Sequence, residues 1–394
     1  MNKVSQSALE GFEPFALHAK SALDSSDKRY GLSRYRSDLN ACTASIRKGS
    51  KSFHLASLLL PPETRKAAVA LYAFCRHSDD LIDDPRSDRH SLQQLRERLD
   101  LIYRGTPADY PCDRAFQKTV TDYAIPKCIP AALLDGFEMD IAKRHYQTLA
   151  DVKEYATGVA ATVGLMMALL MRTGEPQHLA RAADLGIAMQ LTNIARDVGE
   201  DARNGRIYLP ADWLDQHGIN PETFLVSPRF SPELGEVIKR LLQEAERHYR
   251  LGHAGIAALP PDCRHAIRSA ALIYEEIGME IVANGYDSVT QRAHTSLMRK
   301  VSLLAAARRP ATDRSASAKQ AREAAADPAA AGLVNAAARS FSIAKAKKSF
   351  QSNGLPDASS SERLLCLLIR LQNESRQDVR FHKLAARQRA ARLT

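Results

Sequence analysis

The sequence predicts an all-α protein, on the evidence of its composition, the spacing of its polar residues and the positions of its prolines. Ala and Leu are abundant, whereas the alternating Val-, Ile- and Thr-rich runs typical of strands are scarce. Hydrophobic residues make up 45% of the 394 residues, which is enough to build a sizeable core. The sequence shows neither a strand-and-turn rhythm nor a repeat of solenoid length.

Prolines mark the borders of several expected helices. Because proline suits the first turn of a helix and cannot continue one, a helix should cover 61–84 and stop before Pro85. A second helix is expected over 89–104, and four prolines then interrupt the middle of the chain. Asp151 is placed to cap a helix over 151–172. The other expected helices cover 130–145, 177–203, 231–252, 262–284 and 289–308.

We expect a single all-helical domain over 40–309, preceded by a loosely ordered lead-in over 1–39. The following segment, 310–394, is rich in Ala, Ser, Arg and Lys and poor in larger apolar residues, which predicts a largely disordered tail without a function. Within it, the capping-box pattern Ser359-Ser-Ser-Glu362 precedes an apolar run. This pattern predicts an amphipathic basic helix near 361–390, of the kind that can contact a membrane surface.

The positive charge is concentrated in that tail. The whole chain has a formal net charge of +10, and fifteen Lys and Arg against seven Asp and Glu lie beyond residue 309. The helical domain is therefore close to neutral. A nucleic-acid partner is not expected, because it would need a basic face on the domain.

Cysteines and apolar runs indicate the compartment. The six cysteines form no CxxC pair, which favours free thiols in a reducing environment over a zinc site. The first residues lack the pattern of a signal peptide, and the longest apolar run, 164–171, is far shorter than the ~20 residues that span a bilayer. We expect a cytoplasmic protein with at most peripheral contact to a membrane. The sequence does not indicate an oligomeric state.

Two acidic clusters on predicted helices are the most informative feature. The first is Arg76-His-Ser-Asp79-Asp80-Leu-Ile-Asp83-Asp84, and the second is Gln190-Leu-Thr-Asn193-Ile-Ala-Arg196-Asp197-Val-Gly-Glu200-Asp201. Residues three or four positions apart share one face of a helix. This spacing gives two polar stripes, one of Tyr72, Arg76, Asp79 and Asp83, and one of Gly186, Gln190, Asn193, Asp197 and Asp201. Apolar residues flank both stripes, so each should face a cavity.

The carboxylates of these stripes need a counter-charge. Carboxylates four positions apart repel each other, and the repulsion grows in a cleft. Divalent cations with oxygen ligands offset such charge, and Mg²⁺ held by one or two carboxylates usually completes its shell with substrate phosphate. The alternative is a pair of solvated acidic faces. An EF-hand is not expected, because neither cluster has its alternation of glycine and oxygen ligands.

The segments around these clusters resemble the squalene and phytoene synthase family, in order and over about 40–305. Asn193 to Asp201, followed by Gly205-Arg-Ile-Tyr-Leu-Pro210, is similar to the family's second aspartate-rich signature, and Leu71 to Arg76 with Asp79 and Asp83 is similar to its first. The other similar segments are Ser50-Lys-Ser-Phe53, Tyr155 to Gly164 and Arg292-Ala-His-Thr. Some relatives carry His where Gly49 stands, so Gly49 is assigned no role. The tail beyond 310 resembles no part of the family.

The resemblance implies an isoprenoid-synthase-type bundle of helices around a central cavity. It also implies a head-to-head condensation of two geranylgeranyl diphosphate molecules through a cyclopropyl diphosphate intermediate. The implied metal ligands, for Mg²⁺ with Mn²⁺ as the alternative, are Asp79, Asp83, Asn193, Asp197 and Asp201. The implied contacts to the two substrates are Ser50, Ser52, Phe53, Tyr72, Arg76, Tyr155, Gln190, Asn193, Arg196, Tyr208 and Arg292. Of these, Tyr72 and Arg76 are also expected to take part in catalysis with the four aspartates.

Several alternatives stay open at this point. Core packing is the other explanation for the aromatic residues, and close helix packing is the other explanation for small residues such as Gly164 and Gly186. The same chemistry on farnesyl diphosphate, giving a C15-derived presqualene or dehydrosqualene product, is the nearest rival. The segments around Trp213 and Arg292 look closer to the bacterial phytoene synthase branch, which favours the C20 substrate, and no NADPH requirement is expected. A non-catalytic scaffold of the same fold would predict eroded acidic stripes, whereas both stripes are intact.

Overall fold

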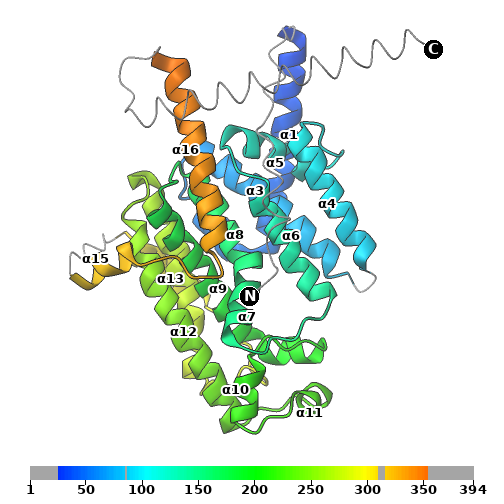
Figure 1. The fold of residues 1–394 in the computed structure, drawn as a ribbon, viewed down its shortest axis with the longest axis vertical. Coiled ribbons are helices and arrows are strands. Elements are labelled where there is room, and N and C mark those ends of the chain that lie inside the picture. The colour runs from blue at the N-terminus through cyan, green and yellow to red at the C-terminus, as the bar shows by residue number, and fades with distance from the viewer. Residues whose placement is uncertain (1–24, 85–86, 309–315, 354–394) are drawn as a thin grey trace, which may run out of the picture. The chain divides into compact units, whose positions relative to one another are not determined.

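The computed structural model describes residues 25–84, 87–308 and 316–353. Within these residues every regular element is a helix and no strand occurs, which confirms the all-α prediction (Figure 1). The chain divides into two compact units, Met1–Ala338 and Arg339–Thr394. The elements are α1 (Ser25–Gly49), α2 (Lys51–Ser57), α3 (Pro62–Ile82), α4 (Arg89–Arg104), α5 (Pro111–Asp122), α6 (Cys128–Ile141), α7 (Leu149–Ala156), the π-helical η1 (Thr157–Ala161), α8 (Thr162–Leu170), α9 (Pro176–Arg203), α10 (Ala211–Gln216), α11 (Pro221–Val226), α12 (Pro232–Ile256), α13 (Pro261–Ala283), α14 (Leu297–Ala306), α15 (Ala316–Glu323) and α16 (Ala331–Asn353).

Helix borders follow the prolines and caps that the sequence supplies. Proline occupies the first turn of α3, α5, α9, α12 and α13. The prediction that Asp151 caps the next helix was wrong. Thr148 is the N-cap of α7, and Asp151 is its capping-box partner, because the Asp151 carboxylate accepts a hydrogen bond of 2.8 Å from the Thr148 backbone N–H.

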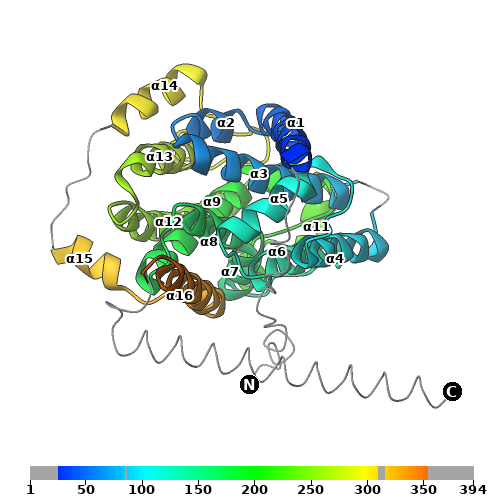
Figure 2. The same cartoon turned by 90° about the horizontal axis from the view of Figure 1, so that it is seen from above.

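Helix α9 lies at the centre of the first unit, where α8, α12, α13 and η1 pack around it (Figure 2). Glycines allow this close packing. A Cβ atom on Gly186 would lie 2.7 Å from the Cα of Ala161, and one on Gly164 would clash with the carbonyl oxygen of Ala182. These two glycines therefore serve helix packing and do not enlarge a cavity.

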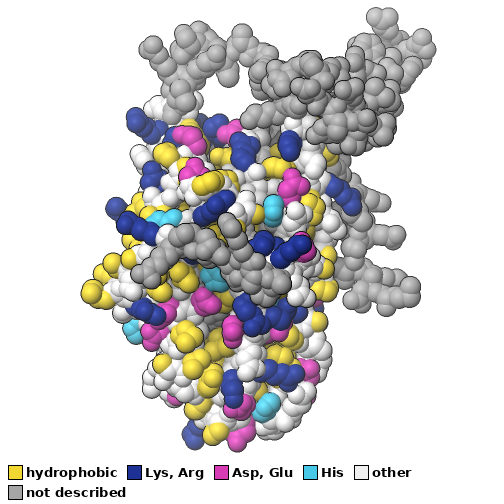
Figure 3. All heavy atoms as spheres, turned by 90° about the vertical axis from the view of Figure 1, so that its left-hand side faces the viewer, with side chains coloured by type: hydrophobic (Ala, Val, Ile, Leu, Met, Phe, Trp, Pro, Cys, Tyr) yellow, Lys and Arg dark blue, Asp and Glu magenta, His cyan; other side chains and the backbone are white. Residues whose placement is uncertain are grey.

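No helix in the described part of the chain is both long and apolar enough to cross a bilayer. The visible side chains on the face in Figure 3 mix hydrophobic, basic and acidic types. The cysteines that the structure describes are unpaired.

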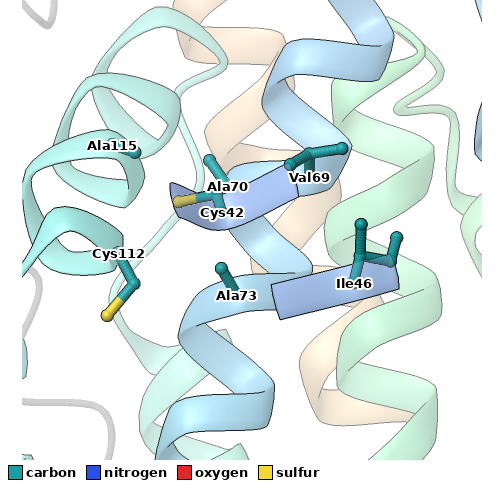
Figure 4. Packing of buried hydrophobic residues seen from close by; sticks show 7 residues of the cluster. All are labelled: Cys42, Ile46, Val69, Ala70, Ala73, Cys112 and Ala115. Carbon is teal, nitrogen blue, oxygen red and sulfur yellow. The ribbon is translucent and has the colours of Figure 1, made fainter. Parts of the chain in front are cut away.

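Helix α1 begins earlier than the sequence analysis expected. It covers the part of the lead-in from Ser25 onward, whereas residues 1–24 lie outside the described part. Cys42 and Ile46 of α1 are buried against α3 and α5, in a cluster with Val69, Ala70, Ala73, Cys112 and Ala115 (Figure 4). Tyr35 and Leu39 extend this contact at helical spacing. The segment is helical because these few apolar residues share one face of an otherwise polar helix.

The segment after 309 also differs from the expected disordered tail. It contains α15 and α16, and the first unit extends to Ala338, beyond the expected domain end at 309. Asp327 forms an ion pair of 2.9 Å with Lys153 and is nearly buried. Charge pairing therefore holds a stretch whose composition alone predicted no structure. The expected helix near 361–390 lies outside the described residues.

Candidate functional site

A cavity of about 610 Å³ opens between α2, α3, α6, α9, α13 and the segment before α14. One part of its wall is apolar and consists of Leu133, Phe137, Val159, Ile273 and Ile277. The rest is polar and carries carboxylates, arginines, hydroxyls and amides. This division suits a ligand with a charged head and a hydrocarbon chain.

The N-terminal wall is formed by the start of α2. Ser50 caps this helix, since its Oγ accepts a hydrogen bond of 3.2 Å from the backbone N–H of Phe53. Ser50, Lys51, Ser52 and Phe53 all line the cavity. The ring of Phe53 packs against Tyr274, with 5.1 Å between their centroids, and lies 6.2 Å from the ring of Tyr72. Tyr274 did not figure in the sequence analysis, although it lies between the cavity residues Ile273 and Ile277 on α13.

The acidic stripe of α3 is divided between the cavity and its edge. Tyr72, Arg76 and Asp79 line the cavity. Arg76 forms an ion pair of 3.1 Å with Asp79 and another with Asp80. Asp83 is the C-cap residue, is more exposed, and forms an ion pair of 3.5 Å with Arg206.

The stripe of α9 is divided in the same way. Gln190, Asn193 and Arg196 line the cavity. The Asp197 carboxylate accepts hydrogen bonds of 2.8 Å from both Arg196 Nε and Arg292 Nε. Asp201 lies in the next turn, in a small pocket that Arg206 and Tyr208 also line.

Electrostatic coupling shows that the two stripes approach each other. Burial, together with the nearby charge of Asp83, raises the pKa of Asp79 to about 6. Burial and the charges of Asp197 and Glu200 raise the pKa of Asp201 to about 7. Asp140 contributes to both of these pKa shifts, so carboxylates from α3, α6 and α9 share one region.

Asp197 behaves in the opposite way. Burial by itself raises its pKa, but the hydrogen bonds from Arg196 and Arg292 outweigh burial and lower the pKa below its usual value. Two arginines thus stabilise the negative charge of Asp197. Asp79 and Asp201 have too little positive charge nearby to offset the effect of burial on their pKa values.

Sequence reasoning missed Asp140, which lines the cavity from α6. Its carboxylate accepts a hydrogen bond of 2.6 Å from Tyr208 Oη and one of 3.1 Å from Tyr155 Oη. The rings of the two tyrosines stack at 4.9 Å. The spacing of Leu133, Phe137 and Asp140 could have revealed it, since a carboxylate there continues the apolar stripe of α6.

The donor set fits a hard divalent cation. All candidate ligands offer oxygen, and the buried Oδ1 of Asn193 has no hydrogen-bond partner. No group of three or more His, Cys, Asp or Glu side chains in the described ranges is arranged to hold a metal by itself. A cation here would therefore take one or two protein ligands from each helix and the remainder from substrate or water.

The cavity of this all-helical bundle suits a ligand that carries an anionic group on an apolar chain. The chain belongs to the squalene/phytoene synthase family, whose sequence profile matches residues 46–299. This confirms the family resemblance seen in the sequence, and with it an enzyme of the prenyl transferase kind.

Individual relatives agree with this assignment. The chain is 44% identical to a phytoene synthase of Cereibacter sphaeroides, over 86% of this chain and 95% of that protein. It is 48% identical to a phytoene synthase of Rhodobacter capsulatus, over 68% of this chain and 80% of that protein. Because 86% of 394 residues is about 339 residues, the Cereibacter match must extend beyond residue 308 and include α15.

Solved structures support the fold. A dehydrosqualene synthase in complex with a ligand superposes with a TM-score of 0.65 and 34% identity, over 70% of this chain and 97% of that one. A squalene synthase from Alicyclobacillus acidocaldarius superposes with a TM-score of 0.60 and 25% identity, over 64% of this chain and 96% of that one.

Proposed function

We propose that this protein is a phytoene synthase that condenses two geranylgeranyl diphosphate molecules head to head. The observation that carries the proposal is the cavity, in which an apolar wall adjoins two acidic helices and several arginines. The relatives at 44% and 48% identity are named phytoene synthases, which supports the C20 substrate over the C15 one.

The acidic helices would hold Mg²⁺ through Asp79, Asp83, Asn193, Asp197 and Asp201, and Mn²⁺ is the alternative metal. Bound there, the metal would supply Lewis-acid stabilisation of the leaving diphosphate. The unpaired Oδ1 of Asn193 and the raised pKa values of Asp79 and Asp201 support this assignment. Asp140 would add negative charge to the same region from α6.

The arginines would bind the diphosphate oxygens. Arg76, Arg196 and Arg292 border the cavity, and a guanidinium can donate two parallel hydrogen bonds to a phosphate. In the free protein these groups form ion pairs with Asp79, Asp80 and Asp197. On substrate binding, the arginines would exchange these ion pairs for contacts with the diphosphate.

The reaction then proceeds in two stages. The allylic C–O bond of one substrate breaks and its electron pair leaves with diphosphate. The double bond of the second substrate attacks the resulting carbocation, and loss of a proton closes a cyclopropane ring. In the second stage the remaining diphosphate leaves, the ring rearranges, and loss of another proton gives phytoene. Two diphosphates and two protons are released, and no reductant such as NADPH is consumed.

Aromatic rings would shield the cationic stages. Phe53, Tyr72 and Tyr155 present rings to the cavity, and an aromatic face attracts a cation within about 6 Å of its centre. Tyr208 does not line the main cavity. Its proposed role is to orient Asp140 through their hydrogen bond. Ser50, Ser52 and Gln190 would add polar contacts to the substrates.

The substrate is tested by parallel reactions of the purified protein with geranylgeranyl diphosphate and farnesyl diphosphate in Mg²⁺, each repeated with excess EDTA. The proposal predicts a larger kcat/KM for the C20 substrate and no turnover in EDTA. A larger kcat/KM for the C15 substrate would assign the protein to dehydrosqualene or presqualene diphosphate synthesis, the kind of enzyme with which it shares 34% identity.

We also propose that the enzyme works in the cytoplasm with peripheral contact to a membrane. A C40 hydrocarbon has no polar group and needs a lipid phase after release.

A further inference from the structure

Gly49 is the last residue of α1 and lines the cavity, although the backbone does not require a glycine there. The residue is helical, and its φ angle is not among the positive ones that favour glycine. An alanine could adopt this conformation, and within a helix it is ordinarily more stable than glycine. The space around Gly49 is therefore what distinguishes glycine from alanine at this position.

That space is occupied by the hydroxyl group of Tyr72. A Cβ atom on Gly49 would lie 2.5 Å from Tyr72 Oη, whereas its next contacts, Tyr72 Cζ and Arg76 Cδ, would be at an ordinary 3.5 Å. Gly164 and Gly186 differ, because the atoms that a Cβ would meet there belong to the backbone. At Gly49 the helices could keep their places, and only the tyrosine side chain would have to move.

Tyr72 is bordered on its other sides by the core and by a second aromatic ring. It lies on α3 next to Ala73, where α1 and α3 pack together in the buried cluster of Figure 4. Its side chain packs against that cluster, and its ring lies 6.2 Å from the ring of Phe53. Tyr72 and Phe53 both line the cavity, as Gly49 does. A tyrosine displaced from Gly49 would therefore change its position relative to a bound substrate.

We propose that Gly49 is a positioning residue, whose missing side chain admits the Tyr72 hydroxyl and thereby sets the place of the Tyr72 ring in the cavity. The consequence for catalysis rests on the proposed function, in which this ring shields a carbocation. To reach an ordinary van der Waals separation from an added methyl group, the hydroxyl would have to move by about 1 Å. A displacement of about 1 Å can lower a reaction rate by up to about a hundredfold.

A double-mutant cycle of Gly49→Ala and Tyr72→Phe tests the proposal. Tyr72→Phe removes the one atom that the added methyl group would meet too closely. With Tyr72 intact, Gly49→Ala should lower kcat about tenfold or more, with little change in KM. In the Tyr72→Phe background, the same change should alter kcat by less than about twofold. A methyl group that obstructed the substrate directly would instead raise KM equally in both backgrounds, and that result would overturn the proposal.

Thermal unfolding follows the same cycle without any turnover. In the Tyr72→Phe background, Gly49→Ala should raise Tm, because alanine then replaces glycine in a helix without a clash. With Tyr72 intact, the clash should cancel this gain or lower Tm. Gly31→Ala is the matched control, because Gly31 lies on the same helix and no described atom lies within 4 Å of an added Cβ. It should raise Tm equally in both backgrounds and leave kcat unchanged.

Two further results would contradict the positioning role. Equal Tm shifts from Gly49→Ala in the two backgrounds would show that the Tyr72 hydroxyl does not need this space. Full kcat in the Gly49→Ala variant would show that the space does not serve the reaction. If the Tm values are coupled as expected but the unmodified protein makes no C40 product, the contact between Gly49 and Tyr72 stands and the proposed function is refuted.

Discussion

The hydroxyl of Tyr208 donates a hydrogen bond of 2.6 Å to Asp140, while Tyr155 donates to the other oxygen of the same carboxylate. This relationship joins three separate segments of the chain, and Tyr208 lies 68 residues beyond Asp140. It also fixes a carboxylate between the two acidic helices, although burial raises the pKa of Asp140. Hydrogen bonds from both tyrosines oppose that increase and favour the charged form.

Replacing Asp140 should therefore impair the reaction. Asp140→Asn keeps the size of the side chain but removes its charge, and we expect kcat/KM to fall by about tenfold or more. Asp135→Asn is the control, because Asp135 lies on the same helix, is exposed and pairs with Arg96. Steady-state kinetics of both variants, compared by their kcat/KM values, test this prediction. Equal activity in the two would show that Asp140 has only a structural role.

The carboxylates of α3 and those of α9 should each be needed for turnover. Asp79→Ala and Asp197→Ala should each lower turnover by about a hundredfold or more, because each removes a proposed ligand for the metal that would stabilise the leaving group. Asp122→Ala, which removes an exposed carboxylate paired with Lys118, should leave turnover unchanged. Helical circular dichroism checks the fold of all three variants. Full turnover in either cavity variant would contradict the metal assignment.

Stability should depend on pH through Asp201. Its pKa of about 7 in the folded state is well above the value of about 3.9 for an unfolded chain, so the folded state holds the proton more tightly. In EDTA, the free energy of unfolding should therefore fall as pH rises from about 4 to about 7. Asp201→Asn should weaken this decrease, which makes the variant more stable relative to the unmodified protein at pH 8 than at pH 5.

Denaturant unfolding at pH 5 and pH 8 measures this effect. Added Mg²⁺ should raise the Tm of the unmodified protein more at pH 8, where the carboxylates are ionised. A pH dependence that is the same in the variant would show that Asp201 does not carry the charge repulsion.

The segment after residue 309 should be needed for stability. Arg181 is almost fully buried on α9, donates a hydrogen bond of 3.1 Å to the Ala325 carbonyl, and forms a hydrogen bond to the Ala321 carbonyl. A chain ending at Arg309 would lose both acceptors and the buried Asp327–Lys153 ion pair. We expect this to cost about 3 kcal/mol or more.

A chain that ends at Asn353 is the matched control for this truncation, because it keeps all of these contacts. Thermal unfolding should show a clearly lower Tm for the chain ending at Arg309 than for this control. Equal Tm values would support the sequence-based expectation of a dispensable tail.

The helical fold could be predicted from the sequence because helix propensity, proline positions and the spacing of polar residues all depend on residues that are close together in the chain. The cavity-facing positions of Tyr72, Arg76, Asp79 and Asn193 follow from the same local periodicity. The spacing could not indicate that Asp83 pairs with Arg206, or that Asp197 pairs with Arg292, because these partners are brought together only by tertiary packing.

Two features depend on tertiary contacts that residue spacing alone could not establish. Asp140 is one of three acidic residues on α6, and its partners Tyr155 and Tyr208 come from other segments, so spacing within α6 could not reveal their hydrogen bonds. The stretch with α15 has a composition typical of disorder, and it is held by contacts with Arg181 and Lys153 that composition does not encode. A segment of low hydrophobicity is expected to be disordered unless residues of the folded domain bind it through ion pairs or hydrogen bonds.

The most direct test is to incubate the purified protein with Mg²⁺ and geranylgeranyl diphosphate alone, and to measure both the extracted lipids and the released diphosphate. We predict a C40 hydrocarbon with two diphosphates released for each molecule formed, without NADPH. Binding of the substrate with neither hydrocarbon nor diphosphate released would contradict it and leave a scaffold of the same fold as the explanation.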